Sequence, residues 1–305
     1  YVLILSGDQL YQMDFVEMLE NHKKLGAEIS VATIPVGDRE APEFGILKSQ
    51  KGLITAFVEK PKKELLPDWL SDTGQEMKAA GRNYLASMGI YIFNRKLLFE
   101  LLQHEFLQAT DFGKEIIPQS IHQYKVASYQ YSGYWTDIGN IHSFFEANLE
   151  LTKDLPAFDL FDSNRTIYTR PRMLPPAKIS GTTLEKALVA EGSIIHASRL
   201  EHSVIGIRSR IGHGTTIVSS YLMGSDYYET LEEIESAAKD GTPPLGVGER
   251  CYIHNAILDK NVRIGNDVRI DGGSHLENAD HELYTVKDGI VVVKKGAILP
   301  SGFVI

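Results

Sequence analysis

The stretch Tyr1–Asp14, YVLILSGDQLYQMD, decides how the first half of the chain is interpreted. It opens with the unbroken apolar run VLIL, which stops abruptly at Ser6. Such a run predicts a strand buried on both faces of a parallel sheet. Ligands of open α/β sheets bind at the carboxyl ends of the strands, so we expect Asp8 to project into a crevice there. An aspartate that only shapes the turn is the alternative at this position.

Helix and strand patterns continue the α/β half. Asp14 and Glu17 form a capping-box pattern for a helix that ends near Gly26, and residues 28–36 read as the next strand. Residues 43–60 read as a hairpin whose returning strand ends in EKP. The proline predicts an extended Lys60 whose ammonium points into the cleft, and a solvated surface lysine is the alternative.

Further polar residues punctuate the later strands of this half. Ser87 and Gly89 lie inside the apolar strand 84–93, where small residues predict close approach by a helix or a ligand. Thr110 and Asp111 follow a helix, and either can cap the next one. Asp137 stands after strand 126–131, before a helix capped by Asn140. Two strand-end carboxylates in one sheet could hold one divalent cation.

The second half of the chain changes its period. From about residue 179, apolar positions recur roughly every six residues with small residues between them, as in the pairs Ile211/Ile217 and Val262/Val268. This repeat predicts a parallel β-helix. We therefore place the catalytic-type domain at 1–151, a proline-rich linker at 152–176 and the β-helix at 177–305, with an acidic insertion near 223–247.

Composition limits the classes of partner. A net charge of -9 argues against nucleic acid or an anionic membrane as a general partner, and no apolar run is long enough to cross a membrane. The single cysteine, Cys251, excludes an internal disulfide, and we expect it to serve in packing. The chain begins inside an expected core strand without an initiator methionine. We expect a fragment that lacks its natural N-terminus, so any targeting signal is unreadable.

Five motifs together resemble a known family. They are the WTDIG that ends the α/β half, the linker TRPRMLPPAK, the hexapeptide repeat, the insertion MGSDYYET and the terminus KKGAILPSG. The whole chain resembles glucose-1-phosphate adenylyltransferase, also called ADP-glucose pyrophosphorylase. The resemblance implies an α/β fold with a Rossmann-like, GT-A-like nucleotidyltransferase domain, incomplete at its N-terminus, followed by a left-handed parallel β-helix. It implies formation of ADP-glucose and pyrophosphate from ATP and glucose 1-phosphate in glycogen or starch synthesis.

The resemblance also assigns roles to residues. Asp8 and Asp137 match the aspartates that hold Mg²⁺, and two carboxylates with substrate oxygens suit that ion. Lys60 matches the catalytic lysine that anchors the phosphate of the nucleophile. The positions that match the sugar-phosphate pocket are Gly45, Glu59, Lys60, Ser87, Asp111, Phe112 and Trp135.

Regulation and assembly are also implied by the resemblance. Arg172, Lys260 and Lys295 match positions that bind a phosphorylated effector, and each could equally be a solvated surface charge. The family implies a homo- or hetero-tetramer. We expect a cytoplasmic bacterial protein, with a plastid location left open.

Departures from the family keep alternatives open. The glycine-rich loop that cradles the triphosphate, GGGxGTRLxPLT in the family, lies upstream of LSGD and is absent here, so these residues alone should bind ATP poorly. Gln9 and Gln12 stand where many members carry a histidine and a basic residue. A regulatory subunit with weakened catalysis is therefore one alternative. Transfer of another nucleotide, uridylyl or thymidylyl, is a second, and an acyl-transferring β-helix, which would need a catalytic histidine, is a third.

Overall fold

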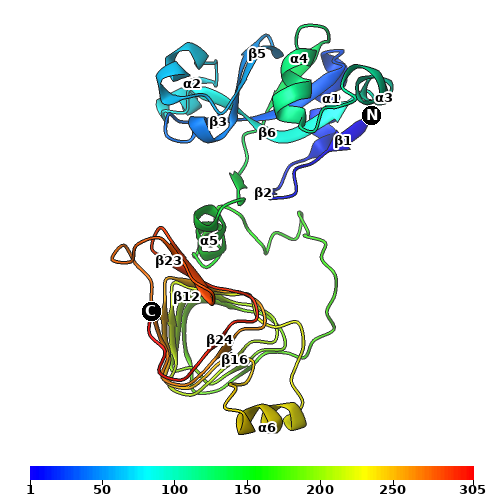
Figure 1. Cartoon of the computed structure of the whole chain (residues 1–305). Coiled ribbons are helices and arrows are strands. Elements are labelled where there is room, and N and C mark those ends of the chain that lie inside the picture. The colour runs from blue at the N-terminus through cyan, green and yellow to red at the C-terminus, as the bar shows by residue number, and fades with distance from the viewer. The chain divides into compact units, whose positions relative to one another are not determined.

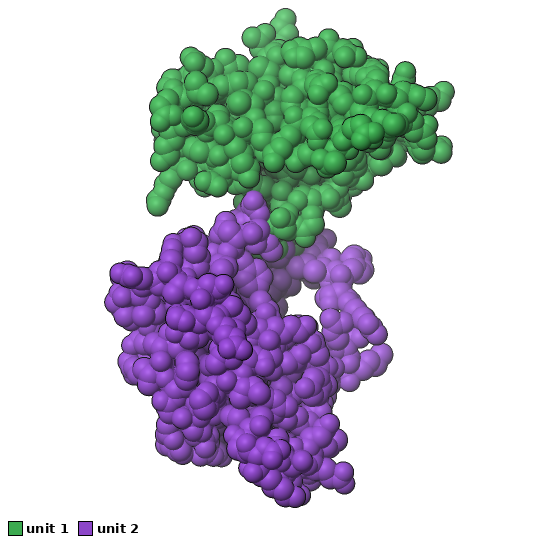
Figure 2. All heavy atoms as spheres, in the orientation of Figure 1, with its two compact units in different colours: residues 1–135 green, residues 136–305 purple.

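The computed structural model describes all residues from Tyr1 to Ile305. The chain divides into two compact units, Tyr1–Trp135 and Thr136–Ile305, which are coloured separately in Figure 2. The sequence-based boundary lay later, after residue 151. None of the helices combines the length and the apolar character that crossing a membrane requires.

The first unit is a mixed α/β layer structure (Figure 1). Its elements in chain order are β1 (Val2–Ile4), β2 (Gln9–Tyr11), α1 (Phe15–Lys24), β3 (Ile29–Val36), the short helix η1 (Ala41–Glu43), β4 (Gly45–Gln50), β5 (Leu53–Glu59), η2 (Lys63–Trp69), α2 (Gln75–Ala79), β6 (Tyr84–Phe93), α3 (Arg95–Glu100), η3 (Leu101–Glu105), η4 (Phe112–Ile116), α4 (Ile117–Ser120) and β7 (Val126–Gln130), with β8 (Trp135–Asp137) beginning at its last residue.

The sheet of the first unit has the order β1-β6-β3-β7-β5-β4. Strands β3 and β7 pair in parallel, whereas β6 runs antiparallel to both β1 and β3. Strands β1 and β3 are therefore parallel to each other with β6 between them. The predicted hairpin is confirmed, because β4 and β5 pair in antiparallel register from Gly45–Glu59 to Gln50–Leu53.

The prediction of a first strand buried on both faces of a parallel sheet is wrong. Strand β1 lies at the sheet edge, pairs only with the antiparallel β6, and leaves Leu3 39% exposed. The cap of the following helix is confirmed, since Asp14 Oδ1 accepts a hydrogen bond of 2.8 Å from the Val16 N–H. The reciprocal half of the capping box does not form, because Glu17 instead accepts a hydrogen bond from the Tyr129 hydroxyl.

The second unit is the predicted β-helix, whose coils stack as a triangular prism in Figure 1. Its elements are α5 (Ile141–Glu150), β9 (Lys178–Ile179), β10 (Thr183–Val189), β11 (Ile194–Ile195), β12 (Arg199–Ile205), β13 (Arg210–Ile211), β14 (Thr216–Val218), β15 (Tyr221–Leu222), α6 (Leu231–Lys239), β16 (Gly246–Val247), β17 (Tyr252–His254), β18 (Ala256–Leu258), β19 (Arg263–Ile264), β20 (Arg269–Asp271), β21 (Ala279–Asp280), β22 (Tyr284–Lys287), β23 (Ile290–Val293) and β24 (Ile298–Leu299).

Parallel ladders join successive coils of the β-helix. In one ladder Leu200 pairs with Ile217, Ile217 with Ile253 and Ile253 with Ile270, and all four side chains are fully buried. Cys251 is buried in the same core, as its predicted packing role requires. The helix α5 packs on this unit through Phe145.

Candidate functional site

The loop that carries Asp8 lies against strand β6 of the first unit. Asp8 is exposed, and its Oδ1 accepts a hydrogen bond of 2.7 Å from the Ser6 hydroxyl. A Cβ built on Gly89 would lie 3.4 Å from Gln9 Nε2 and 3.5 Å from Ser6 Cβ. The small residue in β6 therefore makes room for this loop, so the predicted close approach comes from the chain itself.

Two polar groups of β6 meet beside that loop. Ser87 hydrogen-bonds the hydroxyl of Tyr91, a side chain that is 6% exposed. Burial raises the pKa of Tyr91 to about 12, although the hydrogen bond with Ser87 acts in the opposite direction. The phenol therefore stays protonated near neutral pH and can donate a hydrogen bond.

Three oxygen atoms converge around Gly113. A Cβ built on this glycine would lie 3.4 Å from Asp111 Oδ1, 3.6 Å from the Tyr91 hydroxyl and 3.7 Å from Glu59 Oε2. Asp111 is held there as the predicted helix cap, because its Oδ1 accepts a hydrogen bond of 3.0 Å from the Lys114 N–H. Two carboxylates and a phenol thus meet beside this glycine, and such groups can form hydrogen bonds with the hydroxyl groups of a sugar.

Strand β5 ends at Glu59 in this position, and Lys60 follows it. Burial raises the pKa of Glu59 above its ordinary value, while the charge of Lys60 lowers it and the charge of Asp111 raises it. The predicted extended conformation of Lys60 is wrong, since its φ is 45°. Its backbone therefore lies in the left-handed region, and its N–H donates a 3.1 Å hydrogen bond to the Phe44 carbonyl.

Close packing explains two further residues of the predicted pocket. Gly45 pairs with Glu59, and a Cβ on Gly45 would lie 2.5 Å from the Phe57 ring and 2.8 Å from Glu59 Oε2. A larger residue at this position would require the Phe57 ring and the Glu59 carboxylate to move. Phe112 packs against Tyr91 with ring centroids 5.9 Å apart, so it borders the same group of oxygens.

Trp135 is held by the loop that follows Asp8. Its indole N–H donates a hydrogen bond of 3.1 Å to Gln9 Oε1, and its ring packs edge-on against Phe44 at 5.2 Å. Gln9 thus orients an aromatic side chain.

The two predicted magnesium ligands fall in different units. Asp8 belongs to the first unit and Asp137 to the second, so their approach stays a prediction. Asp137 Oδ1 accepts a 2.8 Å hydrogen bond from the Gly139 N–H, which leaves its other oxygen without a hydrogen bond, as in Asp8. Free carboxylate oxygens fit a hard cation. The chain contains no group of three or more histidine, cysteine or acidic residues that could hold a metal.

The comparison with protein families agrees with this architecture. Residues 1–154 match the model described as nucleotidyl transferase, and residues 172–304 match the GLGC left-handed parallel beta-helix domain. The chain belongs to the nucleotidyl transferase family. The β-helix is therefore left-handed, and the predicted order of a nucleotidyltransferase domain followed by a left-handed β-helix is confirmed.

Two of the three predicted effector residues of this nucleotidyl transferase lie around one acid. Lys260 Nζ is 2.7 Å from Asp226 Oδ1. Hydrogen bonds from Lys260 and Asn261 lower the pKa of Asp226, and the nearby charge of Lys295 adds to this effect. Arg172 lies in the segment before β9 and is exposed, and it forms no salt bridge.

Sequence reasoning missed Tyr91 and Gly113 as parts of the candidate site. Tyr91 has a signal in the sequence, because it follows Ser87 at a spacing of four within a strand, which places both on one face. Gly113 has only its position after Asp111 and Phe112. Its importance follows from the three oxygens around it, of which those of Tyr91 and Glu59 come from distant parts of the chain.

Proposed function

We propose that this nucleotidyl transferase forms ADP-glucose and pyrophosphate from ATP and α-D-glucose 1-phosphate, as a step of glycogen or starch synthesis. The family supports a nucleotide and a sugar phosphate as substrates. The observation that carries the finer assignment is the second domain, because a GLGC-type β-helix follows the nucleotidyl transferase domain in the same chain.

In the proposed reaction a phosphate oxygen of glucose 1-phosphate attacks the α-phosphorus of ATP. The new bond joins that oxygen to the α-phosphorus, while the bond from the α-phosphorus to the bridging oxygen breaks. Pyrophosphate leaves with the electron pair and its negative charge. Such transfers depend mainly on positioning and on charge stabilisation, which is what this site offers.

The candidate site residues of the first unit have separate roles in this proposal. Glu59 and Asp111 accept hydrogen bonds from the glucose hydroxyls, and Tyr91 donates one. Lys60 supplies a positive charge for the phosphate of the nucleophile. Phe112 and Trp135 border the sugar with aromatic rings.

Asp8 and Asp137 would hold Mg²⁺, as the free oxygen on each carboxylate permits. When bound, the cation neutralises charge that builds on the triphosphate. Asp8 is exposed, and the Ser6 hydroxyl donates a hydrogen bond to one of its two oxygens.

The test is ADP-glucose formation by the complete protein with ATP, glucose 1-phosphate and MgCl₂, followed by chromatography. Asp8→Asn should lower kcat at least 100-fold with unchanged thermal stability. The matched control is Asp68→Asn, an exposed aspartate of η2 without a salt bridge. Absence of ADP-glucose with the unaltered protein would contradict the proposal. Product formed faster from UTP or dTTP would support another nucleotidyl transfer.

A regulatory subunit is the second candidate, because neither Gln9 nor Gln12 brings a positive charge to the Asp8 loop. It predicts no activity alone and full activity with a partner subunit, insensitive to Asp8→Asn. A phosphorylated effector at Lys260, Lys295 and Arg172, and a tetrameric assembly, belong to the same proposal. Since Asp226 already occupies Lys260, an effector must displace it, and Asp226→Asn should tighten effector binding.

A further inference from the structure

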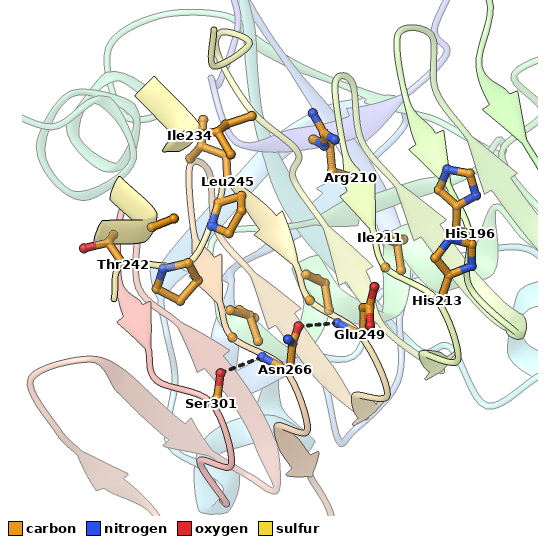
Figure 3. A pocket seen from close by; sticks show the side chains of 18 of the residues that line it. His196, Arg210, Ile211, His213, Ile234, Thr242, Leu245, Glu249, Asn266 and Ser301 are labelled. Atoms are coloured by element: carbon orange, nitrogen blue, oxygen red, sulfur yellow. Dashed lines mark hydrogen bonds between the residues drawn. The ribbon is translucent and has the colours of Figure 1, made fainter. Parts of the chain in front are cut away.

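A cavity of about 670 Å³ lies on the β-helix, between one of its sheets and the insertion 223–247 (Figure 3). The sheet carries the strand order β24-β19-β16-β13-β11-β9, and residues of four of these strands line the cavity. The opposite wall comes from α6 and the segment that follows it. This volume is within the range of small-molecule sites.

The wall formed by the insertion is fixed to the β-helix. The carboxylate of Glu229, 3% exposed in its side chain, forms an ion pair of 2.6 Å with Arg263. Glu229 also accepts a hydrogen bond from the Leu245 N–H, while Arg263 donates one to the Pro243 carbonyl. The Tyr228 hydroxyl donates to the Gly192 carbonyl at 2.9 Å. The cavity is therefore pre-formed, which limits the entropy lost on binding.

The lining has an apolar side and a polar side. The insertion contributes Ile234, Ala238, Pro243, Pro244 and Leu245. In Figure 3 the insertion residues gather on one side of the cavity, with His196 and His213 on the other. A ligand that fits must have an apolar body and one polar end.

Three polar side chains of the cavity, those of Glu249, Asn266 and Ser301, already have partners. The Glu249 carboxylate is 3.0 Å from Arg250, and its N–H donates to Asn266 Oδ1 at 2.8 Å. The Asn266 N–H donates to the Ser301 hydroxyl at 3.0 Å. These bonds hold successive coils together, so they do not select a ligand.

Arg210 differs from every other arginine of the β-helix. Four of the others form salt bridges, namely Arg199, Arg250, Arg263 and Arg269. The fifth, Arg208, lies over the Tyr228 ring. Arg210 is among the residues that line the cavity and is exposed, and its guanidinium has neither a salt bridge nor a side-chain hydrogen bond. Its planar donor fork matches a carboxylate or phosphate. A second unused polar atom nearby is His196 Nδ1, which is buried without a hydrogen-bond partner.

We propose that this cavity binds a small organic anion, a carboxylate or phosphomonoester with an apolar body, whose charged end pairs with Arg210. A metal ion fits less well. The rings of His196 and His213 stack face to face at 4.6 Å, and no third ligand completes a metal group. The proposal does not depend on the proposed catalytic function, because every residue involved lies in the β-helix.

The test measures binding to the full chain by isothermal titration calorimetry. The probes are phenyl phosphate and benzoate, with benzyl alcohol as the neutral analogue and inorganic phosphate as the headgroup alone. We expect at least one aromatic anion to bind at least tenfold more tightly than either reference. The relative affinity of phenyl phosphate and benzoate identifies the preferred headgroup.

Arg210→Gln should weaken this binding at least tenfold. Lys178→Gln is the matched control, because Lys178 and Arg210 both pair with Ile194 in one ladder, and Lys178 does not line the cavity. Ala238→Phe, on the exposed helix α6, should also weaken binding by filling space and tests the site if Arg210→Gln misfolds. The proposal fails if the anions bind no better than the references, or if both cavity variants bind like the Lys178 control.

Discussion

Replacing Glu229 with alanine should release the insertion 223–247 from the β-helix. Its carboxylate is 2.6 Å from Arg263, and the side chains of Glu229 and Arg263 are 3% and 19% exposed. Because this pair is largely shielded from water, breaking it should cost more free energy than breaking an exposed surface salt bridge. The same carboxylate accepts the Leu245 N–H, so the variant also leaves a backbone donor without its partner.

We expect the free-energy cost of Glu229→Ala to lie at the lower end of the range known for buried ion pairs. Removing one partner of a buried ion pair costs about 3–5 kcal/mol. Arg263 keeps its 2.8 Å hydrogen bond to the Pro243 carbonyl and retains some contact with water, so we expect about 3 kcal/mol. At about 1.4 kcal/mol per factor of ten, the open form of the insertion becomes about 100 times more populated. The opening is local, because the coil ladders do not depend on Glu229.

Amide hydrogen exchange read by mass spectrometry measures this opening. Peptides within 226–245 should exchange about 100-fold faster in Glu229→Ala, while peptides that contain β17 should not change. Glu229→Gln should give a smaller effect, because the amide oxygen still accepts the Leu245 N–H. Glu235→Ala, an exposed position of α6 without a salt bridge, serves as the control. An acceleration below about tenfold in Glu229→Ala would refute the reasoning.

The other predictions concern the first unit, whose Trp69 and Trp135 allow its unfolding in urea to be followed by fluorescence. Burial lowers the pKa of His22 below its ordinary value of 6.5, so the unfolded state binds the proton more tightly and stability should fall as pH drops below that value. His22→Gln should reduce this slope, and an unchanged slope would contradict the assignment. Gln9→Leu removes the acceptor of the Trp135 N–H and should cost about 1 kcal/mol of unfolding free energy. Gly113→Ala should leave thermal stability unchanged and raise the KM for glucose 1-phosphate at least tenfold, because the added methyl group lies beside the three oxygens proposed to bind the sugar. An unchanged KM would show that these oxygens do not bind the substrate.

The β-helix could be predicted from sequence because its period is local. Each coil repeats the same inward apolar positions. The ladder of Ile217, Ile253 and Ile270 can therefore be predicted from the repeat alone. The insertion was less well predicted. Its composition predicts only an acidic excursion, although Thr230 and Glu233 carry the capping-box signal that starts α6.

The α/β half shows which structural features the sequence patterns do not predict. Its helices and strands were largely predictable, but the partner of a strand is a long-range property. Strand β1 has the apolar run of a buried strand and yet lies at an edge, because β6 inserts between it and β3. The convergence of Glu59, Tyr91 and Asp111 has the same origin, since only the fold brings these distant positions together.

Non-glycine residues with a left-handed backbone occur in two different settings in this chain. Left-handed non-glycine residues recur through the β-helix, at positions such as Arg250 and Asp267, where each coil must turn a corner. The first unit has only two, and Lys51 belongs to the hairpin turn with Gly52. Lys60 has no such turn, and the proline after it makes the conformation still less favourable. Strain of this kind persists where the surroundings impose it. It occurs here beside the half-buried Glu59 carboxylate, which forms no salt bridge, and this coincidence supports a ligand site at the end of β5.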